Sequence, residues 1–330
     1  MNEPVLKTSV ILCAFTNERW NDLIAAVDSI RRQNTPAGEI IIVIDHNPDL
    51  YKMALAQFPD IRVLENRGPR GLSDARNTGA ENASQPVVAF MDDDATAEQD
   101  WLTWLLSNYQ DDQVIGVGGT VEPNWMAKRP AWFPDEFAWV VGCSYKGLPE
   151  SVEPVRNMLG CNMSFRREVF ESLGGFRATL GRLGGKPLIS CEETEFCIRT
   201  QRRFPQSRII HEPRARVNHK VPSQRATWHY YRIRCYAEGL SKALVANYVG
   251  AADGLASEWK YTLRVLPLGF LRGIKNSILK GNPTGVLQAY AIASGLVITS
   301  LGYLIGRIKT HPNHPAASTF EVSERGVLPE

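Results

Sequence analysis

The sequence lacks several patterns that identify common classes of protein. Its six cysteines are scattered over 330 residues without a C-x-x-C pair, which argues against a structural zinc site and favours a reducing compartment. The formal net charge is only +2, so the chain as a whole is not expected to bind nucleic acid. The first ten residues show no basic segment followed by an apolar one, so no cleaved signal is expected and the protein is predicted to be cytoplasmic.

Familiar phosphate-binding loops are missing as well. Residues 71–79 (GLSDARNTG) match neither the G-x-G-x-x-G fingerprint nor the P-loop, which excludes a dinucleotide-binding or Walker-type site there. Within this segment Arg76 and Asn77 could instead point from a helix toward a diphosphate or a ribose. The alternative for Arg76 is an ordinary solvated charge on a helix.

Acidic residues are absent from residue 259 to residue 320. Residues 286–305 are mainly apolar, and about 20 apolar residues suffice to span a bilayer, although glycines and hydroxyl residues dilute this run. Three interpretations remain open: a spanning or re-entrant helix, peripheral binding to anionic lipid, and a helical hairpin packed on the rest of the protein. We therefore expect a membrane surface among the partners. The basic residues of the stretch are Lys260, Arg264, Arg272, Lys275, Lys280, Arg307 and Lys309.

What is present is typical of a folded globular protein, with 44% hydrophobic and 22% charged residues in one large or two smaller domains. Over the first 110 residues, apolar β-rich runs alternate with segments of helical spacing, and Ser73 is the expected N-cap of one helix. This alternation predicts a parallel sheet with right-handed crossovers, of the nucleotide-binding type. The expected strands are residues 8–15, 39–44, 61–64 and 86–94, and the expected helices are 18–33, 73–83 and one that begins near residue 101.

Three adjacent carboxylates, Asp92, Asp93 and Asp94, end the strand predicted at 86–94. Ligands bind at the carboxyl ends of strands in open α/β sheets, and oxygen ligands there suit a hard cation such as Mg²⁺ or Mn²⁺. Asp45 ends another strand at the same edge and could accept hydrogen bonds from a base or ribose. The alternatives are a solvated acidic turn for the triplet and a turn residue for Asp45.

The second half is less regular, with strands expected at 114–121, 160–166 and 207–217. Residues 123–154 are rich in aromatics, which fill a core or form platforms for sugar rings. The glycine-rich residues 177–187 suggest a mobile loop over a site.

A helix is expected to begin at residue 190, followed by the acidic pair Glu192 and Glu193. Ser190 and Glu193 fit a capping box, which is a full structural explanation for Glu193. The functional alternative is that one of the glutamates is a general base near the helix N-terminus. His219, at the end of a strand, has no assigned role from its local sequence.

Six segments stand in a recognisable order: TSVILCAFTNE, EIIIVIDHNPD, GLSDARNTGA, VVAFMDDD, GCNMSFRREVFESLGGF and CEETEFCIRTQRR. In their order and spacing, residues 7–240 resemble family 2 glycosyltransferases. The resemblance implies an α/β GT-A (Rossmann-like) fold, a mixed sheet flanked by helices, and an enzyme that transfers a sugar from a nucleotide-diphospho-sugar, expected to be a UDP-sugar, with inversion. The expected domains are a catalytic domain at 1–240, a helical membrane-associating region at 241–310 and a tail at 311–330.

Family roles carry over to individual positions. The resemblance implies that Asp45 contacts the base, that Arg76 and Asn77 lie near the nucleotide, and that Asp92 and Asp94 form the D-x-D motif. Asp94 then binds Mn²⁺ or Mg²⁺, with Asp92 on the ribose side. The remaining expected positions are Asp93 for the cofactor, His219 to complete the metal site, Glu193 as catalytic base and Glu192 as the alternative base.

The expected acceptor is a glycan or lipid-linked saccharide, at the inner face of the cell membrane, as in archaeal-type hexuronosyltransferases that act on polyprenyl-linked glycans. Residues 224–228 only partly echo a Q-x-x-R-W motif, which speaks against a processive polysaccharide synthase. Rival interpretations are a nucleotidyltransferase, which would need a glycine-rich basic loop where residues 14–18 stand, and a catalytically inactive relative.

Overall fold

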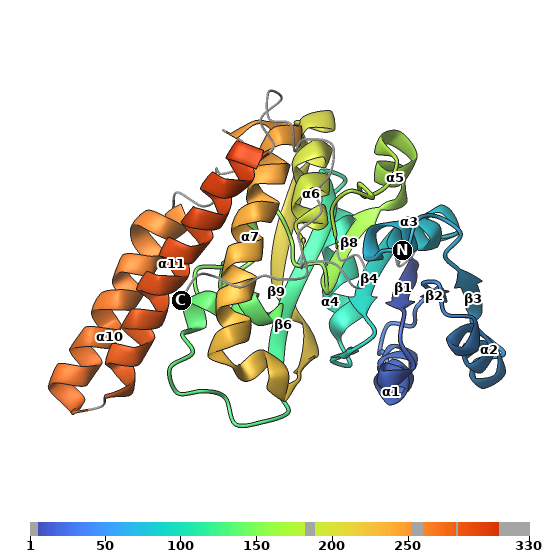
Figure 1. The fold of residues 1–330 in the computed structure, drawn as a ribbon. Helices are drawn as coiled ribbons and strands as arrows, with labels where there is room; N and C mark the ends of the chain where they lie inside the picture. Colours follow the sequence, from blue (N-terminus) through green and yellow to red (C-terminus); the bar gives the residue numbers. More distant parts are fainter. Residues whose placement is uncertain (1–5, 182–188, 252–259, 282, 310–330) are drawn as a thin grey trace.

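A computed structural model describes residues 6–181, 189–251, 260–281 and 283–309. Within them, nine strands form one mixed sheet in the order β3-β2-β1-β4-β8-β6-β9-β5, and β7 pairs with β9 (Figure 1). The strands are β1 (Thr8–Ala14), β2 (Glu39–Ile44), β3 (Arg62–Glu65), β4 (Val87–Asp92), β5 (Ala95–Ala97), β6 (Val114–Trp125), β7 (Glu153–Pro154), β8 (Asn162–Arg166) and β9 (Arg208–Val221).

The first four strands of this order are parallel, which confirms the predicted nucleotide-binding half. The rest of the sheet is mixed, because β8 runs antiparallel to both β4 and β6, while β6 and β9 are parallel. Asp92 lies opposite Cys13 in the register, and Ile44 lies opposite Ala14, so β2 and β4 end at the same edge.

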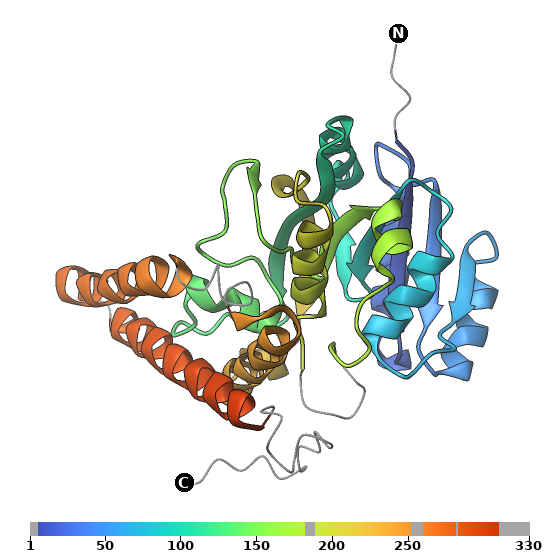
Figure 2. The ribbon, with the colours of Figure 1, turned by 90° about the horizontal axis from the view of Figure 1, so that it is seen from above.

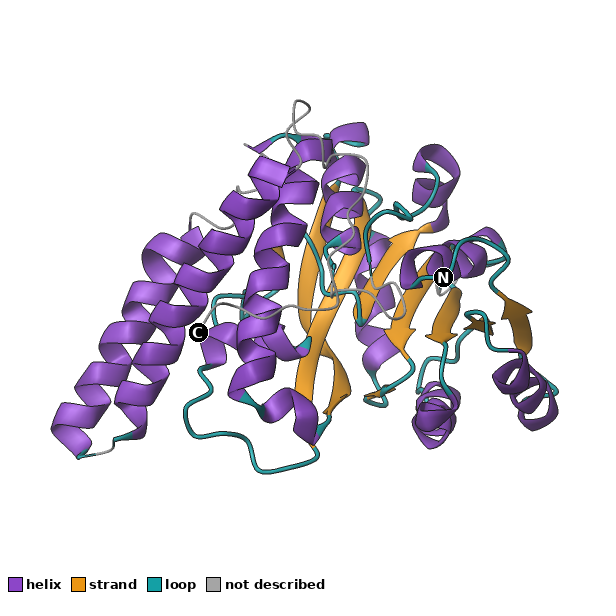
Figure 3. Cartoon of the chain, in the orientation of Figure 1, coloured by secondary structure: helices purple, strands orange, loops and turns teal. Residues whose placement is uncertain are grey.

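Helices cover both faces of the sheet (Figures 1 and 3), and alternating side chains of the central strands belong to two separate cores. Val10 and Leu12 of β1 belong to the core beneath one layer, and Ile11 belongs to the core beneath the other, as the two-residue period of a strand requires. The first layer contains α1 (Trp20–Arg31), α2 (Pro48–Gln57) and α4 (Trp101–Ser107). The second contains α3 (Leu72–Glu81), α5 (Arg167–Leu173) and α6 (Glu192–Arg203).

Two predicted helix caps are wrong. Helix α3 begins after Gly71, and the Ser73 hydroxyl donates to the carbonyl oxygen of Leu180 at 2.6 Å instead of capping the helix. Helix α6 follows Cys191, whose side chain forms no cap, so the Ser190–Glu193 capping box does not form. Helix α2, with Asn47 as its N-cap, had not been predicted.

The C-terminal part forms a helical unit beside the sheet, made of α7 (Trp228–Val249), η5 (Tyr261–Val265), α10 (Leu266–Lys280) and α11 (Thr284–Lys309). Figure 2 shows α10 and α11 side by side as a hairpin that projects from the body. The expected domain boundary at residue 240 falls within α7, which is continuous through it. The expected tail at 311–330 lies outside the described residues.

Small residues bring α11 close to its neighbours. A Cβ on Gly239 of α7 would lie 2.1 Å from the Thr299 carbonyl oxygen, and one on Gly302 would lie 2.3 Å from that of Tyr236. A Cβ on Gly273 of α10 would lie 2.6 Å from the Gly285 carbonyl oxygen. Only glycine permits these backbone approaches, so α11 is held by the protein along its small-residue face.

Candidate active site

A cleft of about 500 Å³ opens beside the carboxyl end of β4. Its walls come from distant parts of the sequence: Asp92 from β4, His219 from β9, Glu193 from α6 and Tyr303 from α11. Trp139 and Tyr145 of the predicted aromatic segment line it too, as does Tyr261, and all three also pack against the hydrophobic core. A cavity of this size is suitable for a ligand larger than a single sugar.

The three adjacent aspartates divide between two environments. Asp92 lines the cleft, whereas Asp93 and Asp94 are buried and pair with Arg19 at 2.9 and 3.0 Å. Burial and the charge of Asp94 raise the pKa of Asp93 to about 7, although Arg19 opposes this shift. Burial also disfavours ionisation of Asp94, but the hydrogen bond from His219 and the charges of Arg19 and Arg225 outweigh it and hold the pKa of Asp94 below its usual range.

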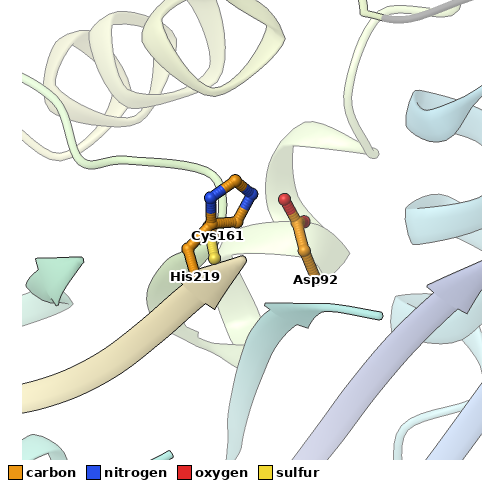
Figure 4. Close-up of side chains that lie close together, drawn as sticks. All are labelled: Asp92, Cys161 and His219. Atoms are coloured by element: carbon orange, nitrogen blue, oxygen red, sulfur yellow. The ribbon is translucent and has the colours of Figure 1, made fainter. Parts of the chain in front are cut away.

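A candidate metal site lies where β4 and β9 end. Ligand atoms of Asp92, Cys161 and His219 all lie within 4.8 Å of one another, and Figure 4 shows Asp92 and His219 facing each other. The Nε2 atom of His219 lies 3.3 Å from Oδ1 of Asp94, so Asp94 reaches the same imidazole. Of the expected metal-site residues, Asp92 and His219 are therefore brought together, whereas Asp94 lies beside them with one oxygen paired to His219 and the other to Arg19.

Cys161 is a member of this cluster that sequence reasoning missed. Burial and the charge of Asp92 raise the pKa of its thiol. The carboxylate oxygen and imidazole nitrogen of the other two residues are donors that suit Mn²⁺.

Arg76 connects the metal side of the cleft with α6. Its buried guanidinium donates to Glu192 at 2.7 Å, to Asp92 at 3.1 Å and to the carbonyl oxygen of Gly160 at 3.0 Å. Burial alone would lower the pKa of Arg76, but the charges of Glu192 and Asp92 outweigh it and raise that pKa. Arg76 is thus an internal ion-pair partner rather than a solvated helix charge.

The two adjacent glutamates consequently differ. Both glutamates line the cleft, but Glu192 is paired with Arg76, whereas Glu193 has no ion-pair partner among the described residues. Burial and the charge of Glu192 raise the pKa of Glu193 to about 8, close to the pH at which a base works best. Cys191, just before them, adopts φ = 73°, a left-handed conformation that is uncommon for a residue other than glycine and often marks functional sites.

Two residues expected to contact the nucleotide, Asp45 and Asn77, already form hydrogen bonds within the protein. Asp45 is buried and accepts hydrogen bonds from Asn66 Nδ2 at 2.7 Å and from the Gly71 amide at 3.0 Å. The Asn77 side chain bonds both the amide and the carbonyl of Phe176, on a different face of α3 from Arg76. Arg76 lines the cleft and Asn77 does not, so this geometry gives no support for the expected contact of Asn77 with the nucleotide. Most of the expected mobile loop, from residue 182 to residue 187, lies outside the described residues.

Known proteins share the sequence and the fold. The sequence profile described as "Glycosyl transferase family 2" matches residues 9–174. The chain is 36% identical over 306 residues to the "Glucosyl-dolichyl phosphate glucuronosyltransferase" of Haloferax volcanii, covering 91% of this chain and 96% of that protein. It is 27% identical over 280 residues to the "Succinoglycan biosynthesis protein ExoM" of Rhizobium meliloti, covering 82% and 84%.

Two solved structures confirm the predicted fold class. The first is "Mannosyltransferase PcManGT from Pyrobaculum calidifontis in complex with GDP-Man and Mn2+", with a TM-score of 0.55, 19% identity and coverage of 90% of this chain and 88% of that one. The second is the "Crystal structure of GalNAc-T7 with UDP, GalNAc and Mn2+", with a TM-score of 0.52, 18% identity and coverage of 86% and 59%.

Proposed function

We propose that this protein extends a lipid-linked saccharide by one sugar. The premise is that the chain belongs to glycosyltransferase family 2 and is an enzyme of that family. The expected donor is a UDP-sugar. In support, the Haloferax volcanii relative is by its name a glucuronosyltransferase of glucosyl-dolichyl phosphate, and the two solved structures by their titles hold nucleotides with Mn²⁺. The product would carry the new sugar on a hydroxyl of the acceptor.

The position of Glu193 in the cleft is the observation that supports this proposal most directly. An inverting transfer is a single in-line displacement, in which the acceptor hydroxyl attacks the anomeric carbon and loses its proton to a base. Glu193 is the glutamate of the pair that faces the cleft without an ion-pair partner among the described residues, and its raised pKa favours taking a proton. Glu192 is disfavoured as base because Arg76 holds it.

Asp92, Asp94 and His219 would hold a divalent cation where β4 and β9 end. When bound, such a cation supplies Lewis-acid stabilisation of the departing nucleoside diphosphate. Arg76, paired with both Asp92 and Glu192, holds the end of β4 and the start of α6 together, which would keep the proposed metal ligands and the proposed base in fixed positions.

The membrane is the proposed location of the acceptor, because α10 and α11 expose bulky apolar side chains on their outer surface. In α11 the buried positions are mostly small, such as Gly285, Gly295 and Gly302, whereas bulky apolar side chains face outward. This is the opposite of a soluble helix and the pattern of helices that pack within lipid. The outward apolar residues, each about half exposed or more, include Leu268, Leu271, Ile278, Leu279, Val286, Leu287, Tyr290, Val297, Leu301, Leu304 and Ile308.

The charge of this region also favours binding to a membrane. Residues 259–320 contain basic but no acidic side chains, which suits the anionic cytoplasmic leaflet. Among the described residues, α11 is the one helix that by length and composition could cross a membrane, but a third of its apolar window is buried in the protein. We therefore favour a hairpin that lies partly in the inner face of the cell membrane over a helix that spans it alone.

A donor screen tests the proposal. Full-length protein is incubated with Mn²⁺ or Mg²⁺, a panel of nucleotide sugars and a glucosyl isoprenyl phosphate, and thermal stability and released nucleotide are measured. We expect one UDP-sugar to stabilise the protein only with the metal, and nucleoside diphosphate to be released. Release of pyrophosphate would instead indicate nucleotidyl transfer, and no binding of any nucleotide sugar would indicate an inactive relative.

A further inference from the structure

Two residues, Ser190 and Cys191, lead the chain into α6 directly before Glu192 and Glu193. The side chain of Cys191 does not cap the helix, and its backbone is left-handed, with φ = 73°. A residue other than glycine keeps such a conformation only where its surroundings hold it. The contacts of these two residues therefore determine where the proposed base stands.

Three hydrogen bonds tie these two residues to α7. The Ser190 amide donates to Oγ of Ser241 at 3.0 Å, and the Ser190 hydroxyl donates to Oε2 of Glu238 at 3.2 Å. The Cys191 thiol donates to Oε1 of Glu238 at 3.4 Å. Glu238 and Ser241 are three residues apart and share one face of α7, so both hold the chain at the same point.

Apolar packing supports these hydrogen bonds. The side chain of Cys191 is buried in a small core cluster that includes Val245 of α7. Val245 stands four residues after Ser241, so it lies on the same face of the helix. The start of α6 is therefore attached to α7 from Glu238 to Val245, which is about two helical turns.

Glu238 is itself held in one place on α7. Nη2 of Arg234 lies 3.7 Å and Nζ of Lys242 lies 3.3 Å from its carboxylate. Burial disfavours ionisation of Glu238, but the charges of Lys242 and Arg234 outweigh it and lower the pKa of Glu238. Glu238 is thus a fixed, ionised acceptor for the Ser190 hydroxyl and the Cys191 thiol.

Helix α7 is in turn fixed by α11. The backbone approach of Gly239 to Thr299 lies next to Glu238 in the sequence, and that of Gly302 to Tyr236 lies one turn earlier on α7. The helical unit with the outward apolar face therefore reaches the start of α6 through α7.

We propose that Glu238 and Ser241 are positioning residues, which set the place of the Glu193 carboxylate by holding Ser190 and Cys191. This inference rests on the proposed function, in which Glu193 is the base. It gives the helical unit a part in the chemistry in addition to its part in membrane attachment.

Ser241→Ala tests the position of the base in the full-length enzyme, with the donor found by the screen and a glucosyl isoprenyl phosphate as acceptor. Ser241 is buried and is not among the residues that line the cleft, so a substrate does not touch it. We expect kcat to fall about tenfold, since displacing a catalytic group by about 1 Å costs about 100-fold in rate. The KM values of donor and acceptor should stay as in the wild type.

Ser29→Ala is the matched control. Ser29 of α1 is also buried, donates to the carbonyl oxygen of Ala26 at 2.7 Å and accepts from the Ala97 amide at 3.0 Å, as Ser241 does with its own two partners. Ser29 does not line the cleft either. The two variants should lose similar thermal stability, whereas kcat should fall only in Ser241→Ala.

Glu238→Gln gives a second readout, the pH profile. The charged groups that affect Glu193 are Glu192 on α6, Arg76 on α3 and Glu238 on α7, and the charge of Glu238 raises the pKa of Glu193. Removing that negative charge makes ionisation of Glu193 easier, so the rising limb of kcat/KM should move to lower pH. Glu168→Gln, at an exposed glutamate of α5, should leave the limb in place.

An equal kcat in the folded Ser241→Ala and Ser29→Ala variants would overturn the inference. So would a higher acceptor KM in Glu238→Gln with an unmoved limb, because Glu238 would then bind the acceptor directly. If Ser241→Ala does not fold, Glu238→Gln decides. Failure of the proposed function looks different, since the wild-type enzyme would release no nucleoside diphosphate from any nucleotide sugar.

Discussion

Arg76 determines which of two adjacent glutamates is available for chemistry. Its bond to Glu192 is a buried ion pair, and breaking such a pair by removing one partner typically costs about 3–5 kcal/mol of folding free energy. Glu193, one residue further along α6, has no such constraint and faces the cleft. At the scale of residues, therefore, the two glutamates should respond differently to the same substitution.

We expect Glu193→Gln to bind donor and metal as the wild type does but to transfer sugar about 10²–10⁴ times more slowly, the usual contribution of a general base. Glu192→Gln should instead lower the thermal midpoint, because it leaves Arg76 with one carboxylate fewer. Donor binding, turnover and thermal unfolding are measured for both. If Glu193→Gln turns over normally and Glu192→Gln binds donor but does not turn over, the base is misplaced by one residue.

The raised pKa of Glu193 also predicts a pH dependence. A base acts in its ionised form, and a pKa of about 8 means that the ionised fraction grows as pH rises from 7 to 9. We expect kcat/KM to rise over this range and then level off, and the rising limb to move in Glu193→Asp, which changes the position and surroundings of the carboxylate. A limb unaffected by Glu193→Asp would assign the titration to another group, such as Asp93.

Residues within the motifs were predictable because their chemistry is local: carboxylates that follow a buried strand, and acids at the start of a helix. Their partners were not predictable. Arg19 pairs with Asp93 across 74 positions, and Arg76 pairs with Glu192 across 116, so only the fold brings these charges together. Cys161 is part of no metal-binding sequence motif. It lies beside Asp92 and His219 only because β8 is next to β4 in the sheet.

At the scale of elements, the contact between α7 and α11 fixes one wall of the cleft. At the glycines, the backbones of the two helices are in direct contact. No side chain lies between them that could move aside for a larger residue. The sequence shows α11 as an apolar run but gives no sign of its partner. The glycines that looked like a dilution of hydrophobicity are the residues that permit the contact.

We expect Gly302→Leu to destabilise the helical unit by about 1–3 kcal/mol, the common cost of overpacking, because even a Cβ would lie 2.3 Å from the Tyr236 carbonyl oxygen. Ala293→Leu is the control, since Ala293 is exposed on the same helix. Limited proteolysis and thermal unfolding of both variants measure the effect. Equal stability of the two variants would contradict the close contact.

At the scale of the whole molecule, a catalytic domain and an outward apolar hairpin are joined through the continuous helix α7. The sequence indicates both parts, with a boundary expected at residue 240 because the resemblance to family 2 glycosyltransferases ends there, but the helical backbone of α7 continues through that position. The outward apolar surface of the hairpin is consequently fixed relative to the cleft.

We expect the triple variant Leu271→Ser, Ile278→Ser and Leu301→Ser to lose most of its binding to vesicles that contain anionic lipid, since each side chain is half or more exposed and burying one contributes about 1.5–3 kcal/mol at most. Leu55→Ser, at an exposed leucine of α2, should bind as the wild type does. Co-sedimentation at two salt concentrations measures both the apolar and the electrostatic parts. Undiminished binding of the triple variant would assign attachment to another surface.

The shared role of α11 as a wall of the cleft and as an apolar outer face has a consequence for kinetics. On the proposed function, a lipid-linked acceptor arrives by lateral diffusion in a two-dimensional medium and never passes through bulk water. The quantity that saturates the enzyme is then the mole fraction of acceptor in the bilayer rather than its molar concentration. Diluting the acceptor with inert lipid would slow the reaction, while diluting the whole suspension would leave the rate per bound enzyme almost unchanged.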